Sequence, residues 1–331
     1  MQAVQMQQVG GPEVLQLVEM AAPEITAADQ IKVQLRAAGI NPIDTKIRSR
    51  GVFYEQALPA VLGCDGAGIV TAVGDDVTHW RPGDEVWFCH GGLGGAQGNY
   101  AEVTVLPAAL AQPKPARLDF VHAAAGPLVL ITAWEALFDR AVLQAGQSVL
   151  IHAGAGGVGH VAIQLAKLVG ARVCTTVGSH EHAEFVRQLG ADEVIDYQQQ
   201  DFVAAVLDWT DGQGVDVALE AVGARVFQQT LEAMAVYGNL ITLLDPGSGI
   251  DWSNARTKNL RIGFELMLTP MLRDIPTALQ HHGEILQQCA QWIDAGKLRL
   301  HVSQTWPLAQ AAEAHRQIEA GHTQGKLVLT L

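Results

Sequence analysis

The clearest chemical signal in this chain is a glycine-rich turn between an apolar run and a segment with helical periodicity. Its spacing is G-x-G-x-x-G, and its residues are Gly154, Ala155, Gly156, Gly157, Val158 and Gly159. Glycine lets the backbone turn tightly and lets a diphosphate approach without meeting a Cβ atom. The first turn of the following helix offers unpaired N–H groups and a partial positive charge to that anion. We therefore predict a dinucleotide site here, against the simpler alternative of an ordinary glycine-rich turn.

The residues after the second expected strand indicate which dinucleotide binds. In an NAD site, a carboxylate about 20 residues past the glycines binds the ribose 2′-hydroxyl. Here no acidic residue follows the strand at 172–177 until Glu181. An acid would repel a 2′-phosphate, whereas hydroxyl and cationic groups would accept it. The candidates are Ser179, His180, His182 and Arg187, each of which could instead be a solvated residue at a helix start. We predict NADPH rather than NADH as the cofactor.

The elements that position this turn alternate between strand and helix. Strands are expected at 148–153, 172–177, 193–195, 215–221, 239–244 and 260–265, and helices at about 157–169, 181–189, 200–207 and 225–236. Such alternation favours a doubly wound parallel sheet. Six strands match the full dinucleotide-binding sheet.

The residues before about 122 have a different pattern, which is mostly β. Ile31, Val33 and Leu35 alternate with polar residues, as expected for a half-buried strand. The glycine-rich segment 63–74 suits tightly bent strands of a barrel-like sheet. In the C-terminal tail we expect helices near 275–295 and 308–320 and a closing strand at 326–331.

Composition limits the classes of function that fit. A length of 331 residues suggests about two domains. The formal net charge of −13 argues against broad nucleic-acid binding, and no apolar run reaches the roughly 18 residues of a membrane span. The four cysteines, Cys64, Cys89, Cys174 and Cys289, show neither metal-ligand spacing nor a disulfide framework. We expect a cytoplasmic protein that binds neither membranes nor nucleic acid.

Seven sequence segments, in a fixed order along the chain, resemble one enzyme family. They are AAGINPIDTKIRSRG (37–51), LGCDGAGIVTAVG (62–74), RPGDEVW (81–87), LITAWEAL (130–137), AGAGGVGHVAIQLAK (153–167), LGADEVIDY (189–197) and TQGKLVL (323–329). With them the chain resembles the medium-chain dehydrogenase/reductase superfamily, and within it the zinc-independent quinone oxidoreductase-like branch.

The resemblance implies an α/β architecture of two domains. A GroES-like, β-rich catalytic domain would take residues 1–122 and 268–331, and a Rossmann domain with a six-stranded parallel sheet would take 123–267. Family members bind their ligands in the cleft between these domains. They commonly pair through the last Rossmann strand, here 260–265, which implies a homodimer.

The resemblance also implies roles for single residues. Thr132 stands where a hydroxyl typically binds the nicotinamide ribose, and Tyr197 stands beside the 2′-phosphate in quinone reductases. Lys326 stands where a basic side chain often reaches the pyrophosphate. Tyr197 could instead cover the core at a strand end, and Lys326 could be a plain solvated lysine.

The zinc ligands of the related alcohol dehydrogenases are replaced here. Asn41 stands where those enzymes have their catalytic Cys, and Cys64-Asp65 stands where they have a His-Glu pair. No Cys lies near Leu130, where their third ligand, another Cys, would be. Residues 85–105, where relatives carry a four-cysteine lobe, contain only Cys89. A catalytic zinc needs three protein ligands and an open position, so we expect no metal.

Without a Lewis acid, a conjugated acceptor is easier to reduce than a simple ketone. The enolate or phenolate formed by hydride addition needs hydrogen-bond donors and a proton. We expect these from Asn41 and Tyr54, with Phe53 in the place of Tyr54 or water as the acid as alternatives. Asp44 could act as an acid if its pKa were strongly raised, or could brace the loop. Loops 51–58, 90–98 and 245–256 would line the pocket. His90 could approach it or could instead lie at the surface.

These observations predict an NADPH-dependent reductase of quinones or α,β-unsaturated carbonyls. Asn41, Tyr54 and Thr132 are its expected catalytic residues, and Asn41 and Thr132 are also expected to contact the cofactor. Two alternatives remain: a zinc-type alcohol dehydrogenase, and a non-catalytic NADPH-binding protein such as a redox sensor or a crystallin-like relative.

Overall fold

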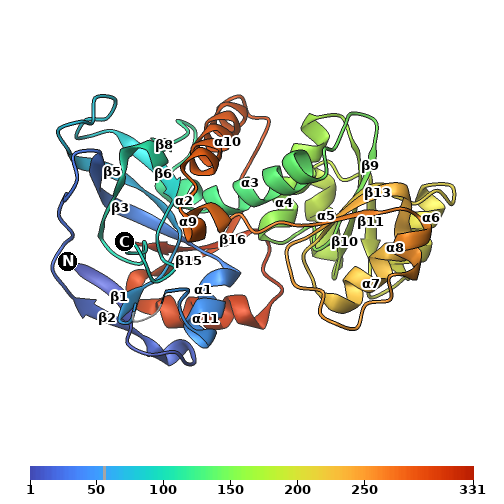
Figure 1. Cartoon of the computed structure of the whole chain (residues 1–331), viewed down its shortest axis with the longest axis horizontal. Coiled ribbons are helices and arrows are strands. Elements are labelled where there is room, and N and C mark those ends of the chain that lie inside the picture. Colours follow the sequence, from blue (N-terminus) through green and yellow to red (C-terminus); the bar gives the residue numbers. More distant parts are fainter. Residues whose placement is uncertain (55–56) are drawn as a thin grey trace. The chain divides into compact units, whose positions relative to one another are not determined.

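The computed structural model describes residues 1–54 and 57–331 and divides the chain into two compact units (Figure 1). Unit 1 comprises Met1–Ile131 and Leu268–Leu331, and unit 2 comprises Thr132–Met267. The first junction lies inside helix α3 (Pro127–Trp134), later than the 122/123 boundary expected from the sequence. Residues 55 and 56 of the expected pocket loop 51–58 lie outside the described residues.

Unit 2 contains the expected six-stranded parallel sheet, with the order β11-β10-β9-β12-β13-β14. The strands are β9 (Ser148–Ile151), β10 (Arg172–Val177), β11 (Glu193–Asp196), β12 (Val215–Glu220), β13 (Met234–Thr242) and β14 (Arg261–Phe264). β13 begins earlier than expected, because its first residues follow β12 around an irregularity in register between Val215 and Val217. This order places the first strand in the middle of the sheet, as in dinucleotide-binding folds.

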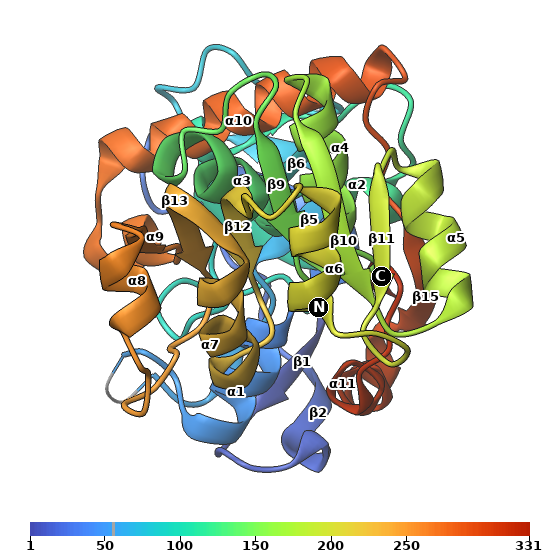
Figure 2. The same cartoon turned by 90° about the vertical axis from the view of Figure 1, so that its right-hand side faces the viewer.

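The first four helices of unit 2 lie between the strands in sequence, as the alternating pattern predicts, and contact the sheet (Figure 2). The helices of this unit are α4 (Gly157–Leu168), α5 (His180–Gln188), α6 (Phe202–Trp209), α7 (Ala224–Ala233) and α8 (Ser253–Thr257), after a π-helical turn at Glu135–Arg140. α4 contacts β9 and β10, and α6 and α7 contact each other. The apolar face of α4, formed by Val161, Leu165 and their neighbours, is fully buried, which fixes the helix on the sheet.

Unit 1 contains a three-stranded sheet and a larger sheet built around one long strand. The small sheet has the order β2-β1-β4, with β1 (Gln2–Met6), β2 (Leu15–Glu19) and β4 (Ala60–Val61). The large one has the order β15-β16-β3-β5-β6-β8, and β7 also pairs with β3. Its strands are β3 (Gln30–Ile40), β5 (Asp65–Val73), β6 (Glu85–Cys89), β7 (Val103–Pro107), β8 (Gln112–Pro113), β15 (Val302–Pro307) and β16 (Lys326–Thr330).

The pairing of β3 with β16 brings together two segments that are nearly 290 residues apart in the sequence. Leu327 lies opposite Ile40 in antiparallel register, so Lys326 lies beside the residue that follows β3. That residue is Asn41, where the chain turns from β3 into helix α1 (Pro42–Arg50). The alternation of Ile31, Val33 and Leu35 toward the core is confirmed.

In its described residues, unit 1 has four further helices. They are α2 (Phe120–Ala124), α9 (Thr269–Arg273), α10 (Pro276–Asp294) and α11 (Ala311–Ala320), with short 3-10 turns at Pro12–Val14, Ala108–Leu110 and Leu308–Gln310. The last two, α10 and α11, agree with those expected near 275–295 and 308–320. Within the described part of the chain, none of the helices combines the length and the apolar character needed to cross a bilayer.

Candidate active site

Three of the four glycines in the turn of unit 2, Gly154, Gly156 and Gly159, differ in the space around them. A Cβ on Gly154 would lie 2.0 Å from Oγ1 of Thr175, and one on Gly159 would lie 2.3 Å from the carbonyl oxygen of Ala153. These two positions must be glycine for the strand, turn and helix to pack. A Cβ on Gly156 would meet only the Ala153 carbonyl oxygen, at 3.2 Å. Gly156 therefore leaves space that a ligand can use.

The first turn of α4 is open to an anion. Gly156 is its N-cap residue, and no side chain among the described residues caps this end by a hydrogen bond. The amide of Gly156 itself donates to the Ala153 carbonyl at 2.9 Å, which closes the turn. The N–H groups of Gly157 and Val158 thus lie in the first turn of the helix, where they have no intrahelical acceptor. This turn suits a diphosphate, as the sequence predicts.

The ends of β10 and β11 form a second part of the expected cofactor site. Tyr197 donates its backbone N–H to Val177 at 3.1 Å, and its ring lies over Gly178. A Cβ on Gly178 would lie 2.4 Å from the Tyr197 hydroxyl oxygen. Tyr197 is 53% exposed, so it does not cover the core.

Ser179 and His182 are joined at the start of α5. The Ser179 hydroxyl accepts a hydrogen bond from the backbone N–H of His182 at 3.2 Å and so caps the helix. His180 and Arg187 are exposed, and Arg187 pairs with Glu184 on the same helix. Ser179 is thus next to Gly178, the residue that contacts Tyr197. The Arg187 side chain, in contrast, already has an ion-pair partner on its own helix.

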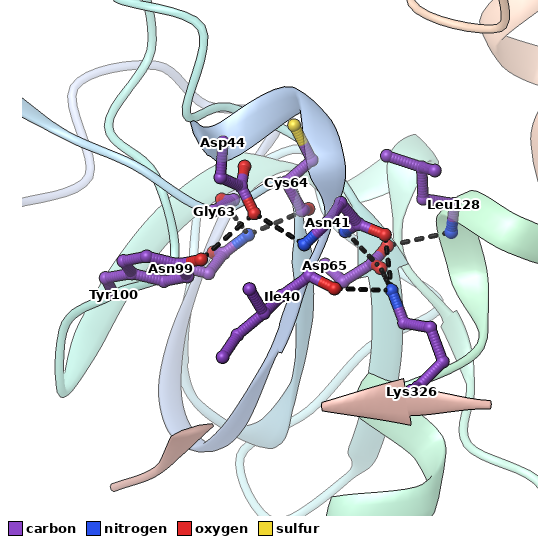
Figure 3. A network of polar contacts seen from close by, with 10 residues as sticks. All are labelled: Ile40, Asn41, Asp44, Gly63, Cys64, Asp65, Asn99, Tyr100, Leu128 and Lys326. Carbon is purple, nitrogen blue, oxygen red and sulfur yellow. Dashed lines mark hydrogen bonds and ion pairs between the residues drawn. The ribbon is translucent and has the colours of Figure 1, made fainter. Parts of the chain in front are cut away.

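In unit 1 the side-chain amide of Asn41 is the centre of a buried polar network (Figure 3). Its Nδ2 donates to Oδ2 of Asp65 at 2.9 Å, and its Oδ1 accepts a short hydrogen bond from Nζ of Lys326. Lys326 also donates to the carbonyl oxygen of Ile40 at 2.8 Å, and its Nζ lies 3.7 Å from Oδ2 of Asp65. Lys326 is only 3% exposed. Its ammonium would have to leave these oxygens to reach a pyrophosphate.

Asp65 connects this network to helix α3. Its Oδ1 accepts the backbone N–H of Leu128 at 2.8 Å, in the first turn of that helix. Burial raises the pKa of Asp65, and the Lys326 ammonium and the Asn41 amide act in the opposite direction. Burial likewise lowers the pKa of Lys326, which the charge of Asp65 opposes. The two charges therefore depend on each other.

Asp44 is a second buried carboxyl beside Asn41. Its Oδ2 accepts the backbone N–H of Asn41 at 2.8 Å and the hydroxyl of Tyr100 at 3.0 Å. Its Oδ1 is buried without a hydrogen-bond partner. Burial raises the pKa of Asp44 to about 7, against the lowering effect of these two donors. Nε2 of His315 lies 3.1 Å from the Tyr100 hydroxyl. Asp44 thus braces the loop and also has the raised pKa that an acid would need.

The other candidates are not among the hydrogen-bond partners given above for Asn41. Tyr54 is partly exposed and its hydroxyl donates to the carbonyl of Met271 at 3.3 Å, while the Phe53 side chain is exposed. Thr132 is buried in α3. His90 is half-buried with its Nδ1 unpartnered, and burial lowers its pKa to about 4. The roles expected of these residues stay predictions.

The donor set around Asn41 does not fit a zinc ion. The Asn41 and Asp65 oxygens contact the Lys326 ammonium, which would repel a metal cation at the same place. The hydrogen bond with Cys89 lowers the pKa of the Cys64 thiol, but burial and two nearby carboxylates raise it overall, which opposes the thiolate that zinc requires. In residues 1–54 and 57–331, no cluster of three or more His, Cys, Asp and Glu side chains could hold a metal.

The contacts of Asn41 with its partners are the part of this site that sequence reasoning missed. Asp65 is noted in the sequence only as a replaced zinc ligand, and Lys326 only as a pyrophosphate contact. Tyr100 and His315 carry no local motif at all. The register of β3 against β16 would have revealed the Lys326 contact, but the sequence does not specify that register.

Comparisons with known proteins find related family models and relatives for this chain. Residues 27–116 match the family model of the alcohol dehydrogenase GroES-like domain, and residues 189–329 match that of zinc-binding dehydrogenases. The quinone oxidoreductase of Pseudomonas aeruginosa is 35% identical over 329 residues, which cover 98% of each chain.

Solved structures are similar over the same length. An alcohol dehydrogenase superfamily protein from Novosphingobium aromaticivorans has a TM-score of 0.92 and 36% identity, covering 100% of this chain and 99% of that one. The Escherichia coli quinone oxidoreductase complexed with NADPH has a TM-score of 0.89 and 32% identity, covering 100% of both chains.

Proposed function

The chain belongs to the quinone oxidoreductase branch of the medium-chain dehydrogenase/reductase superfamily, and from that premise we propose that it is an NADPH-dependent reductase of quinones or α,β-unsaturated carbonyls. The observation that carries the proposal is the Lys326 ammonium on the oxygens of Asn41 and Asp65, two positions at which the zinc dehydrogenases carry metal-binding residues. With that cation in place, the site suits acceptors that delocalise charge themselves and need no metal.

We assign cofactor binding to unit 2. The N–H groups at the start of α4 would hold the diphosphate, and Ser179, His182 and Tyr197 would surround the 2′-phosphate. We expect Thr132 to hold the nicotinamide ribose. The bound dihydronicotinamide supplies a hydride to the β-carbon of an enone or to a quinone ring.

We assign stabilisation of the product oxyanion to unit 1. The Asn41 amide has a second hydrogen on Nδ2, besides the one that Asp65 accepts. Asn41 is fully buried in the ligand-free protein, so we propose that binding of cofactor and substrate gives access to this hydrogen, which then binds the oxygen on which negative charge develops. Tyr54, after releasing the Met271 carbonyl, or water would supply the proton. Asp44 holds the backbone N–H of Asn41 and so fixes the start of the loop.

We propose that two copies of the chain form a homodimer through the end of the Rossmann sheet. β14 is the last strand of that sheet and, in the part of the chain that is described, pairs only with β13. Phe264 on β14 is 61% exposed, and Val236 on β13 is 59% exposed. An edge strand with exposed apolar residues invites pairing. Sedimentation velocity tests this, and a single species of 35 kDa at micromolar concentration would contradict it.

We propose that the protein is located in the cytoplasm, and the state of its four cysteines is the only support for this. All four are buried and free, as in proteins of reducing compartments.

The function can be tested with matched acceptors. We expect the purified protein to oxidise NADPH with 9,10-phenanthrenequinone and with methyl vinyl ketone, and not with butan-2-one, the saturated analogue of the latter. Turnover of butan-2-one that a chelator abolishes would favour the zinc-type alternative. NADPH binding without turnover of any acceptor would favour the non-catalytic alternative.

A further inference from the structure

The Asn41 amide is held at both of its ends by groups of opposite charge (Figure 3). Lys326 binds Oδ1 and Asp65 binds Nδ2. An ammonium can only donate hydrogen bonds and a carboxylate can only accept them. The amide therefore has one possible orientation, since a flip would place its NH2 group against the ammonium and its oxygen against the carboxylate.

Each of the two holding groups is itself fixed by backbone. Lys326 donates to the Ile40 carbonyl at 2.8 Å, and Asp65 accepts the Leu128 N–H at 2.8 Å. Asn41 and Asp65 are fully buried, and Lys326 is almost so. A buried carboxylate and a buried ammonium that contact each other and the same amide form a unit that is costly to rearrange.

We propose that Lys326 and Asp65 are positioning residues that orient and polarise the Asn41 amide, so that its second Nδ2 hydrogen becomes a strong donor to the oxyanion of the reduced substrate. This proposal rests on the proposed function, because it concerns the same reaction. The proposal adds to that function the two residues that make the Asn41 amide an effective hydrogen-bond donor.

The polarisation follows from elementary amide chemistry. A cation at the carbonyl oxygen and an anion at one N–H both favour the resonance form with negative oxygen and positive nitrogen. The remaining N–H hydrogen then carries more positive charge and binds an oxyanion more strongly. A donor prepared in this way before the reaction costs no reorganisation in the transition state.

The test uses Lys326→Met, Asp65→Asn and the double variant. We expect each to lower kcat for methyl vinyl ketone by about 10- to 100-fold, with the substrate KM and the Kd for NADPH changed less than about threefold. The double variant should be no slower than the slower single variant, because the two residues act as a unit. It also removes both buried charges, so it should fold even where one single variant does not.

Lys114→Met is the matched control. Lys114 is another nearly buried lysine of unit 1 that donates to two backbone carbonyls and pairs with Glu85. It makes no contact with Asn41, so its replacement should lower stability without changing kcat.

A chemical rescue separates positioning from mere structural support. Lys326→Ala removes the equivalent of one propylammonium ion. Millimolar n-propylamine should restore kcat at least about fivefold in this variant and should not affect the wild type, and tetramethylammonium, which has no N–H donor, should have no effect.

The outcomes are distinguishable. Wild-type protein that reduces neither acceptor would refute the proposed function itself. The positioning role is tested once the wild type is active and Asn41→Ala is slow. It is wrong if the Lys326 and Asp65 variants then keep wild-type kcat. It is also wrong if Lys114→Met slows turnover as much as they do. Absence of rescue by n-propylamine in a folded Lys326→Ala protein would also contradict it.

Discussion

The glycine turn of unit 2 and the Asn41 network of unit 1 are built in opposite ways. The turn at 154–159 works through backbone N–H groups and through missing side chains. The network works through side chains that are all buried: Asn41, Asp44, Asp65, Tyr100, His315 and Lys326. A substitution in the turn adds atoms where there is no space, whereas one in the network removes the partner of a buried polar group.

This difference determines how each region responds to conditions. Backbone N–H groups carry no titratable proton, so the turn should bind a diphosphate with little dependence of its own on pH. The network contains two carboxyl groups and one ammonium, and its hydrogen bonds depend on which of them are charged. The predictions below test whether the two regions fail in these different ways.

The largest effect is expected from Gly159→Ala. The added Cβ would lie 2.3 Å from the Ala153 carbonyl oxygen and 2.7 Å from Cα of Gly154, and both are backbone atoms that cannot rotate away. We expect the free energy of unfolding to fall by about 3 kcal/mol or more, together with a loss of NADPH affinity. Urea denaturation and a fluorescence titration with NADPH measure the two effects.

Gly156→Ala is the matched variant within the same motif. Its Cβ meets only one oxygen at 3.2 Å, so stability should change by less than about 1 kcal/mol. NADPH affinity should still fall, because the new methyl group stands where the diphosphate approaches. Equal loss of stability in both variants would show that the turn is not divided into packing and binding positions.

The second-largest effect is expected from Asn41→Ala, which changes the network of unit 1 and not the glycine turn of unit 2. Loss of one oxyanion donor should lower kcat by about 100-fold, which is about 2.7 kcal/mol, with little change in the Kd for NADPH. Stopped-flow reduction of methyl vinyl ketone measures it. Asn239→Ala, which removes a half-buried amide bonded to the Ala141 carbonyl in unit 2, serves as the control. Unchanged turnover in Asn41→Ala would exclude Asn41 as the donor.

The sequence predicts one of these regions far better than the other. The strand at Ser148–Ile151, the glycines at 154–159 and helix α4 are contiguous, so local periodicity and glycine spacing suffice to place them. The six strands were expected within a few residues of where they lie, except for the early start of β13 at Met234, which follows an irregular register with β12. An irregularity of this kind has no period for a sequence pattern to detect.

The Asn41 network depends on contacts that are remote in sequence. Asp65 is 24 residues from Asn41, and Lys326 is 285 residues away. The sequence suggests Asn41 as a donor, and the resemblance assigns Lys326 to the pyrophosphate, whereas the structure places the Lys326 ammonium on Asn41. The antiparallel register of β3 and β16 decides this direction, and side-chain identity alone does not encode it.

The third prediction concerns the pH dependence that only the network should show. Burial raises the pKa of Asp44 to about 7 from an ordinary value of 3.8, so between about pH 4 and pH 7 the folded protein holds a proton that the unfolded chain has released. Stability should therefore fall as pH rises through this window, by about 1.4 kcal/mol per pH unit relative to Asp44→Asn. Urea denaturation of both proteins at several pH values measures the difference.

The comparison with Asp44→Asn is needed because buried histidines change the free energy of unfolding with pH in the opposite direction. Burial lowers the pKa of His152 and of His315 to about 3, so their contribution to stability is lost as pH falls below about 6.5. Both histidines remain in the variant, whose amide oxygen can still accept the Tyr100 hydroxyl that His315 contacts, so most of their contribution cancels in the difference. A difference that is constant from pH 4 to pH 7 would mean that Asp44 is ionised throughout this range.

The smallest effect is expected from Tyr197→Phe, which tests whether side chains of unit 2 add to a site made mainly of backbone. The ring contact with Gly178 should remain, and the exposed hydroxyl should contribute little to folding, so stability should change by less than about 0.5 kcal/mol. If the hydroxyl binds the 2′-phosphate, the Kd for NADPH should rise about tenfold and the Kd for NADH should not change. Tyr237→Phe, at the other exposed tyrosine of unit 2, should change neither value. Equal weakening of both cofactors would mean that Tyr197 contacts the part they share, and the preference for NADPH would then rest on Ser179 and His182 alone.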